Sequence, residues 1–280
     1  MSKIYVSSSG GMGNFLFQIS AGIYYKEKYP DIYDEIILIE GQNSSFDWGT
    51  SIGHKKSTRK TKTGENLSYR YTILNKFKFG EIDKANIFEI KNDYTCNHHN
   101  PNSDQNLYIT GYNQNSLLFI EHLNKIPQYL NLEDEEIKSY LRDKYPLIFF
   151  PERKNIMVGI RCDGDFTHMT KVCAESYKRG LEFFKEDHNT NIVVITDRVD
   201  KINDYLIDNY SGTIIVIDED DIVQLYAGLV CDYFILSEST YHYWIAALKN
   251  AISPEKTNVV CFADTDITNR NLALPEWSVL

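Results

Sequence analysis

The amino-acid sequence predicts an α/β protein with two halves, each built around a parallel β-sheet. Short runs rich in isoleucine and valine alternate with amphipathic stretches of about ten residues, most regularly in the second half of the chain. The apolar runs are nearly continuous, which is typical of parallel strands covered by helices on both faces. A chain of 280 residues with 42% hydrophobic content has the length of one large or two medium domains and can bury a sizeable core.

The first half begins with a strand, a helix and a second strand. We expect strands at Ile4–Val6, Glu35–Ile39 and Leu107–Tyr112, and helices from Asn14 to about Lys28 and from Asn115 to Leu123. The segment LEDEEIKSYLRDKY (residues 132–145) predicts another helix, because acidic residues begin it and basic residues end it. The stretch YPLIFFPERKN then predicts a connection between domains, so we expect one domain at residues 1–148 and another at 149–280.

In the second half, strands and helices alternate clearly. The expected strands are NIMVGIR (155–161), NIVVITD (191–197), TIIVID (213–218), DYFILSE (232–238) and NVVCFAD (258–264). The expected helices are CAESYKRGLEFFKE (173–186), VDKINDYLIDNY (199–210), DIVQLYAGLV (221–230) and YHYWIAALKN (241–250). Ligands of such sheets bind at the carboxyl ends of the strands, which makes the residues after each strand the first candidates for a site.

Composition excludes several classes of function. The formal net charge of −10 argues against nucleic acid as the main partner. The five cysteines are odd in number and form no CxxC pair, so we expect reduced thiols in a cytosol-like compartment. No apolar run reaches the roughly 18–20 residues that cross a bilayer, and the first strand begins by Ile4. We therefore expect a soluble cytoplasmic protein without membrane insertion, whose oligomeric state is open.

The loop after the first strand has the layout of a phosphate-binding turn. In KIYVSSSGGMGNFLFQ a strand runs into a serine- and glycine-rich loop that opens a helix. A dinucleotide fingerprint needs three glycines; Gly11 and Gly13 fill the first two places, but the third falls on Leu16, whose side chain would hold helix and strand apart. Glu40, which ends the next strand, suits a ribose-binding acid, so an NAD(P)-dependent enzyme remains a distant alternative.

Polar residues follow four strands of the second half, at Arg161–Phe166, Thr196–Asp197, Asp218–Asp221 and Ser237–Thr240. A guanidinium at Arg161 suits bidentate binding of a diphosphate, although an arginine paired with a nearby aspartate is the plainer reading. Ser239 and Thr240 offer hydroxyl and backbone donors for an anion, or cap the following helix. Asp197 suits a ribose or a nucleobase edge, or is another helix cap.

Three other clusters have plainer explanations. The CNHHN segment (Cys96, His98, His99) has no second pair of metal ligands at a useful spacing. Four acids at Asp218–Asp221 suit the start of a helix without a metal ion. Tyr241, Tyr243 and Trp244 are more often core residues than a sugar platform. We also find no nucleophile elbow and no P-loop, and we expect no metal site.

The ordered segments GGMGNFLFQISAG, ITGYNQNSLLF, VGIRCDGDF, VCAESYKRGLEFF, VVITD, LVCDYFILSESTYHYWIAAL and PEW resemble the α-1,2-fucosyltransferase family. Its motifs typically read GGLGNQ-F-Q, H-V-R-R-G-D-Y and A-N-S-T-F-S-W-W-G-A-W, and the resemblance spans Gly10 to Trp277. It implies a GT-B-like fold, with two Rossmann-like domains whose parallel sheets face a central cleft. It further implies an acceptor-side first domain, a nucleotide-sugar-binding second domain, and inverting, metal-independent transfer of L-fucose from GDP-fucose to a sugar hydroxyl of a glycan acceptor.

Site residues carry over by position. The resemblance makes Arg161 a ligand of the donor phosphates, with Ser239 and Thr240 also on the phosphate side, and Asp197 a candidate on the nucleotide side. The loop from Gly10 to Asn14 would face the cleft. The implied catalytic candidates are Arg161, Asp165 and Asn14. The implied donor-binding residues are Gly11, Gly13, Asn14, Arg161, Asp197, Ser239 and Thr240.

Several motif residues differ in this chain. The motif histidine corresponds to Gly159 and the second arginine to Cys162, while Asp163 is inserted; the residue after the first motif's asparagine is Phe15, and the late asparagine is Glu238. A second arginine would supply a charge-assisted contact worth about 1.5–3 kcal/mol. A different GDP-sugar donor, or a sugar-nucleotide-binding protein without turnover, therefore remains an alternative. The catalytic base and the acceptor glycan are not identified by the sequence.

Overall fold

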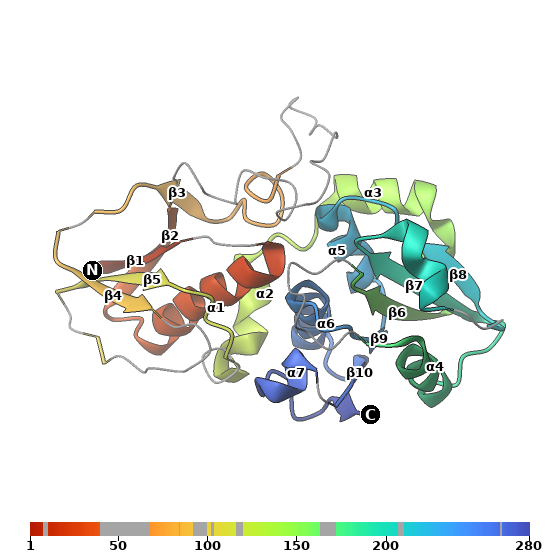
Figure 1. Ribbon diagram of the computed structural model, residues 1–280. Coiled ribbons are helices and arrows are strands. Elements are labelled where there is room, and N and C mark those ends of the chain that lie inside the picture. The colour runs from red at the N-terminus through yellow and green to blue at the C-terminus, as the bar shows by residue number, and fades with distance from the viewer. Residues whose placement is uncertain are drawn as a thin grey trace. The chain divides into compact units, whose positions relative to one another are not determined.

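The computed structural model describes residues 1–7, 11–39, 68–83, 85–91, 100–101, 104–115, 120–162, 172–206, 210–263 and 265–280. These residues form two compact units, Met1–Leu132 and Glu133–Leu280, and each unit has its own sheet (Figure 1). The paired strands of both sheets run parallel. The predicted class, an α/β fold with two parallel sheets, is confirmed.

The sheet of the first unit has the strand order β3-β2-β1-β5-β4. Its strands are β1 (Ser2–Val6), β2 (Tyr33–Ile39), β3 (Lys78–Gly80), β4 (Ile87–Lys91) and β5 (Asn106–Thr110). The long helix α1 (Met12–Lys28) joins β1 to β2, and the 3₁₀ helix η3 (Ile120–Lys125) and the short helix α2 (Ile126–Tyr129) follow β5. The strand order reverses at β1, because β2 lies on one side of it and β5 on the other.

Helix α1 approaches strand β1 most closely at a glycine that the sequence analysis did not single out. A Cβ atom on Gly22 would lie 2.9 Å from Cγ2 of Val6, so only glycine fits without a shift of the neighbour. Leu16, which we expected to hold helix and strand apart, is 1% exposed and packs in the core. The role of the third fingerprint glycine, close packing of helix on strand, is thus filled one to two turns later in α1.

The sheet of the second unit has the strand order β11-β10-β9-β6-β7-β8. Its strands are β6 (Lys154–Ile160), β7 (Thr190–Thr196), β8 (Thr213–Val216), β9 (Tyr233–Ile235), β10 (Asn258–Cys261) and β11 (Ser278–Val279). The helices of this unit are α3 (Glu135–Lys144), η4 (Pro146–Phe149), α4 (Ala174–Phe183), η5 (Val199–Asp204), α5 (Asp221–Leu229), α6 (Thr240–Ile252) and α7 (Asp266–Asn269). All seven residues of β7 are buried, as are Ile156 to Ile160 of β6, which explains the continuous apolar runs.

Two predicted helices differ in the structure. Of the stretch expected as a helix at Asn115–Leu123, residue 115 is described and is not helical, and residues 120–123 belong to η3, which has non-helical backbone angles at His122. Only Val199–Asp204 of the expected helix at 199–210 is described as helical, and it is a 3₁₀ helix. Its apolar residues Ile202 and Tyr205 recur three apart, a spacing that places side chains in line on a 3₁₀ helix. Strands β3, β4 and β11 and helix α7 were not expected.

Helix α3 is tied to the second unit by a nearly buried carboxylate. Glu219, whose side chain is 6% exposed, accepts hydrogen bonds from Tyr140 Oη at 2.6 Å, Lys144 Nζ at 2.5 Å and Tyr145 Oη at 3.2 Å. Burial raises the pKa of Tyr145 to about 12, so its phenol stays protonated and can donate at neutral pH. These contacts explain why the compact second unit begins at Glu133, whereas the sequence predicts a boundary after residue 148.

No helix within the described ranges combines the length and the apolar character needed to cross a membrane. No disulfide joins the four cysteines that the structure describes, Cys162, Cys173, Cys231 and Cys261.

We expect Glu219→Ala to lower the free energy of unfolding by about 1–3 kcal/mol, because three donors lose their shared acceptor in a nearly buried place. Urea denaturation followed by circular dichroism measures the change. Glu135→Ala is the matched control in α3, since Glu135 and Arg142 form an exposed ion pair that we expect to contribute nothing measurable. Equal midpoints for Glu219→Ala and wild type would contradict the role of this carboxylate.

Candidate functional site

The sheet of the second unit reverses its strand order between β6 and β9. From β6 the chain continues to β7 and β8 on one side, then returns to place β9 and β10 on the other side. Ligands of open parallel sheets bind outside the carboxyl ends of the strands at such a switch point. The residues that follow β6, β7 and β9 are Arg161, Asp197 and the segment from Leu236 to Ser239. Three of the four strand ends singled out in the sequence therefore meet at one edge.

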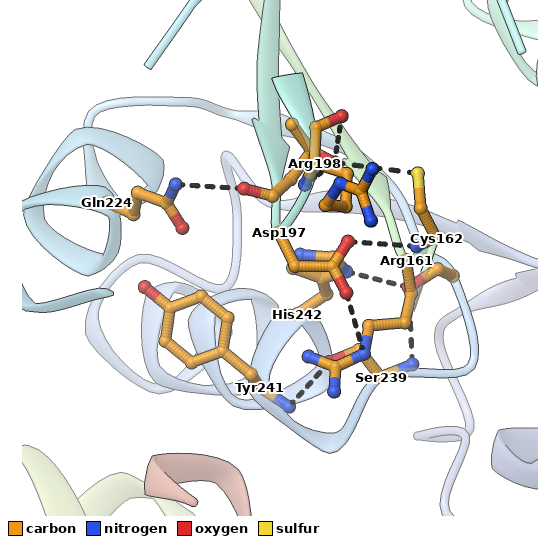
Figure 2. Close-up of polar contacts among 10 residues, drawn as sticks. Arg161, Cys162, Asp197, Arg198, Gln224, Ser239, Tyr241 and His242 are labelled. Atoms are coloured by element: carbon orange, nitrogen blue, oxygen red, sulfur yellow. Dashed lines mark hydrogen bonds and ion pairs between the residues drawn. The ribbon is translucent and has the colours of Figure 1, made fainter. Parts of the chain in front are cut away.

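Arg161 and Asp197 form an ion pair at this edge (Figure 2). Nε of Arg161 lies 3.1 Å from Oδ2 of Asp197, and Oδ1 of the same carboxylate accepts a hydrogen bond from the backbone N of Cys162 at 2.8 Å. The Asp197 side chain is only 4% exposed, whereas that of Arg161 is 33% exposed. The expected pairing of Arg161 with a nearby aspartate is confirmed, and it orients a guanidinium that remains one-third exposed.

Asp197 is engaged on both oxygens by these two contacts, so it holds Arg161 and the end of β6 in place. A direct contact from Asp197 to a ribose or nucleobase stays a prediction. Cys162, the position of the motif's second arginine, is 6% exposed and belongs to the core of the unit. Its sulfur lies 3.9 Å from Oγ1 of Thr196, so the side chain points into the protein. The backbone N of Cys162 is the group that contacts Asp197 at this edge.

Ser239 is the N-cap of α6. Its Oγ accepts a hydrogen bond from the backbone N of Tyr241 at 3.2 Å, and its own backbone N donates to Oγ of Ser237 at 3.2 Å. Thr240 is the first residue of the helix. The capping role expected from the sequence is confirmed, and it is compatible with anion binding, because the start of a 13-residue helix carries a partial positive charge.

His242, in the first turn of α6, was not singled out in the sequence. It is 3% exposed, and its Nδ1 lies 2.7 Å from Oγ of Ser237, which is 2% exposed. The imidazole lies against β6 at Gly159, the position at which the resembling motif has its histidine: a Cβ atom there would come within 2.6 Å of Cγ and Nδ1 of the ring. Two features of the sequence could have indicated this contact: a single histidine within an apolar helix, and a glycine where the family motif has a histidine.

The neighbouring clusters have structural roles. Asp220 caps α5 by accepting from the backbone N of Val223 at 3.0 Å, and Gln224 donates to the carbonyls of Thr196 at 3.2 Å and Ile217 at 3.0 Å. Among the described residues no group of three or more His, Cys, Asp or Glu could hold a metal ion. Tyr243 and Trp244 are fully buried, which confirms core packing, and the hydroxyl of Tyr241 donates to the carbonyl of Asp221.

In the first unit, the predicted loop residues gather at the switch point between β1 and β5. Gly11 is the N-cap of α1 without a side-chain cap, and Gly13 is buried in the first turn. The side chain of Asn14 accepts a hydrogen bond from Nε2 of Gln114 at 2.9 Å. Gln114 follows β5, is 4% exposed and was not among the expected site residues.

Several candidates lie outside the described residues: Gly10, Glu40, the polar stretch at residues 41–66, the CNHHN segment with Cys96, His98 and His99, and the motif residues Asp163 and Asp165. The structure therefore describes Arg161, Asp197, Ser239 and Thr240 at one switch point and Gly11, Gly13 and Asn14 at another. The assignment of Asp165 as catalytic stays a prediction.

Solved structures with a similar fold are glycosyltransferases. NodZ alpha-1,6-fucosyltransferase soaked with GDP-fucose shares 10% identity over 88% of this chain and 92% of its own, with a TM-score of 0.51. A family 9 glycosyl transferase from Veillonella parvula shares 9% identity over 100% of this chain and 86% of its own, with a TM-score of 0.55. A mutant of Arabidopsis thaliana FUT1 in complex with GDP shares 11% identity over 89% of this chain and 68% of its own, with a TM-score of 0.50.

At these identities the likeness shows the fold: two parallel α/β sheets as in glycosyltransferases of the GT-B class. No protein-family model matches the chain, and no curated protein matches it.

We expect the free energies of unfolding of Arg161→Ala, Asp197→Ala and the double variant to be non-additive by about 1 kcal/mol, because removing one partner leaves the other without its counter-charge. Urea denaturation of the three variants and wild type closes the cycle. The exposed pair Lys201–Asp204, whose charged atoms lie 3.7 Å apart, is the matched control, and we expect no measurable coupling there. Additive effects at Arg161 and Asp197 would show that the ion pair does not tie the two strand ends together.

Proposed function

We propose that the protein is a glycosyltransferase of the α-1,2-fucosyltransferase type, which moves L-fucose from GDP-fucose to a sugar hydroxyl with inversion and without a required metal ion. The observation that carries this proposal is the Arg161 guanidinium at the switch point of the second sheet, held by a nearly buried Asp197 yet one-third exposed itself. A guanidinium fixed in this way is suited to a bidentate contact, in which two parallel N–H groups donate hydrogen bonds to phosphate oxygens. The α6 start, with Ser239 and Thr240, follows the neighbouring strand.

The proposed chemistry uses these groups to stabilise the leaving group. The bond between the anomeric carbon of fucose and the β-phosphate oxygen breaks, and an acceptor hydroxyl oxygen bonds to that carbon from the opposite face. Negative charge grows on the departing GDP, and a preorganised arginine with backbone and hydroxyl donors stabilises it better than water does. The acceptor proton passes to a base that is not identified among the described residues, or leaves after the new bond has formed.

Fucose as the donor sugar rests on two kinds of support. The sequence motifs resemble those of α-1,2-fucosyltransferases, and solved structures of similar fold include a fucosyltransferase with GDP-fucose and FUT1 with GDP. The 1,2 linkage rests on the motifs alone, and a different GDP-sugar remains the closest alternative. A glycan acceptor and the absence of a required metal are likewise parts of the proposal.

One observation favours a second candidate, a protein that binds a sugar nucleotide without turning it over. The Cys162 side chain points into the core, so the position at which the motif carries its second arginine supplies no positive charge to this edge. A donor site with fewer positive charges stabilises the leaving diphosphate less. Binding and turnover therefore have to be measured separately.

We expect isothermal titration calorimetry to show binding of GDP, but not of UDP or NADH, to the wild-type protein without added metal. Arg161→Lys should weaken GDP binding by about 10- to 100-fold, because the loss of a bidentate charge-assisted contact costs about 1.5–3 kcal/mol. Arg179→Lys, on the exposed face of α4, is the matched control and should bind GDP like wild type. If Arg161→Lys binds GDP with unchanged affinity, the arginine does not contact the phosphates.

We expect GDP-fucose to be consumed only when a suitable glycan acceptor is present, with release of one GDP for each fucose transferred. A screen of acceptor glycans with a GDP-detection assay measures this, and excess EDTA should leave the rate unchanged. GDP binding without release on any acceptor would support the binding protein in place of the transferase. A rate abolished by EDTA and restored by a divalent ion would contradict the metal-independent mechanism.

A further inference from the structure

The buried imidazole of His242 decides which residue can stand at position 159. Two contacts hold the backbone of Gly159, since it pairs with Ile195 of β7 and its carbonyl accepts a hydrogen bond from the Tyr177 hydroxyl at 2.9 Å. A Cβ atom at this position would lie 2.6 Å from Cγ and Nδ1 and 3.0 Å from Cβ of His242. These atoms lie near the base of the His242 side chain, so a rotation of the ring would not relieve the clash with a Cβ at position 159.

The ring holds a short chain of hydrogen bonds that leads to the start of its own helix. Oγ of Ser237 accepts from the backbone N of Ser239 at 3.2 Å and lies 2.7 Å from Nδ1 of His242. The Ser237 hydroxyl can donate to Nδ1, or accept from it while also accepting from the amide, so the contact joins Ser237 to the imidazole in either tautomer of the ring. Figure 2 draws His242 and Ser239 in the same view as the ion pair of Arg161 and Asp197.

The chain of hydrogen bonds closes the turn that joins β9 to α6. Ser237 lies just after β9, Ser239 is the N-cap and Thr240 opens the helix, whereas His242 reaches back from the first turn to the beginning of this segment. A side chain of α6 thus holds the segment that precedes the helix, and the same ring packs against Gly159 of β6. The imidazole therefore contacts both the segment before α6, through Ser237, and the end of β6, at Gly159.

We propose that His242 is a positioning residue: through Ser237 it fixes Ser239 and Thr240 at the start of α6 in the orientation that binds the donor diphosphate. This inference rests on the proposed function, because it takes the same strand ends as the phosphate site. The imidazole acts through the contact of its Nδ1 with Ser237. Gly159 has no side chain and so leaves room for the ring.

Two substitutions of His242 separate this role from simple packing. In His242→Asn the carboxamide takes the place of Nδ1, and its oxygen or its nitrogen can keep the hydrogen bond with Ser237. In His242→Gln the carboxamide lies one bond further out, near the place of Nε2, and cannot make the same bond. We expect GDP affinity within about threefold of wild type for His242→Asn and about tenfold weaker for His242→Gln, as the loss of one orienting hydrogen bond implies. His188→Gln, at an exposed position ahead of β7, is the control and should bind GDP like wild type.

Calorimetry with GDP gives these affinities, and thermal unfolding without ligand gives the stability of each variant. A packing role alone predicts that the variants differ in melting temperature but bind GDP equally well, and that result would overturn the proposal. A rescue by Gln and not by Asn would also overturn it, because the imidazole would then act through Nε2. If wild type binds no GDP, the proposed function and this inference fail together; if wild type binds GDP and both variants match it, only this inference fails.

A second pair of variants tests the contact with Gly159 directly. Gly159→Ala should weaken GDP binding about as much as His242→Gln does, because the added methyl displaces the ring from Ser237. In a His242→Ala background the same Gly159→Ala substitution should cause no further loss of affinity, since the ring is already absent. Equal losses in both backgrounds would show that the glycine and the imidazole act independently.

Discussion

The position of β6 between β7 and β9 is the constraint on which the rest of the second unit depends. Parallel strands in adjacent register end at the same edge of a sheet, so the chain segments that follow these three strands are brought together however far apart they lie in sequence. The residues of β6 from Ile156 onward and all of β7 are buried, which fixes the register through the apolar core.

Charge is the second organising element of this edge. A carboxylate as buried as that of Asp197 is costly unless it is paired, and it is paired with Arg161 and with the backbone N of Cys162. Under the proposed function the same guanidinium both neutralises Asp197 and contacts the donor diphosphate. A substitution of Arg161 would then change stability and donor binding together.

The sequence predicts the strands and helices that have a strong pattern and misses those that lack one. Strands β6 and β7 are continuous apolar runs, whereas β3 and β4 are short edge strands with mostly exposed or half-buried residues. The rule that ligands bind at strand ends selects Arg161 and Ser239 as candidates, and the structure places both after strands that end at one edge. The partnership of Gly159 with His242 does not, because it is a contact between distant residues that depends on how closely α6 approaches β6. The hydrogen bond between Asn14 and Gln114 was not predicted either, because it also joins residues that are far apart in the sequence.

The central claim is that the edge formed by β6, β7 and β9 binds the diphosphate of a GDP-sugar, and a crystal structure of the protein with GDP tests it most directly. The account predicts phosphate oxygens within hydrogen-bonding distance of the Arg161 guanidinium and of the donors at Ser239 and Thr240, with Asp197 still paired to Arg161. Phosphates bound elsewhere on the protein, with Arg161 turned away from them, would contradict the account.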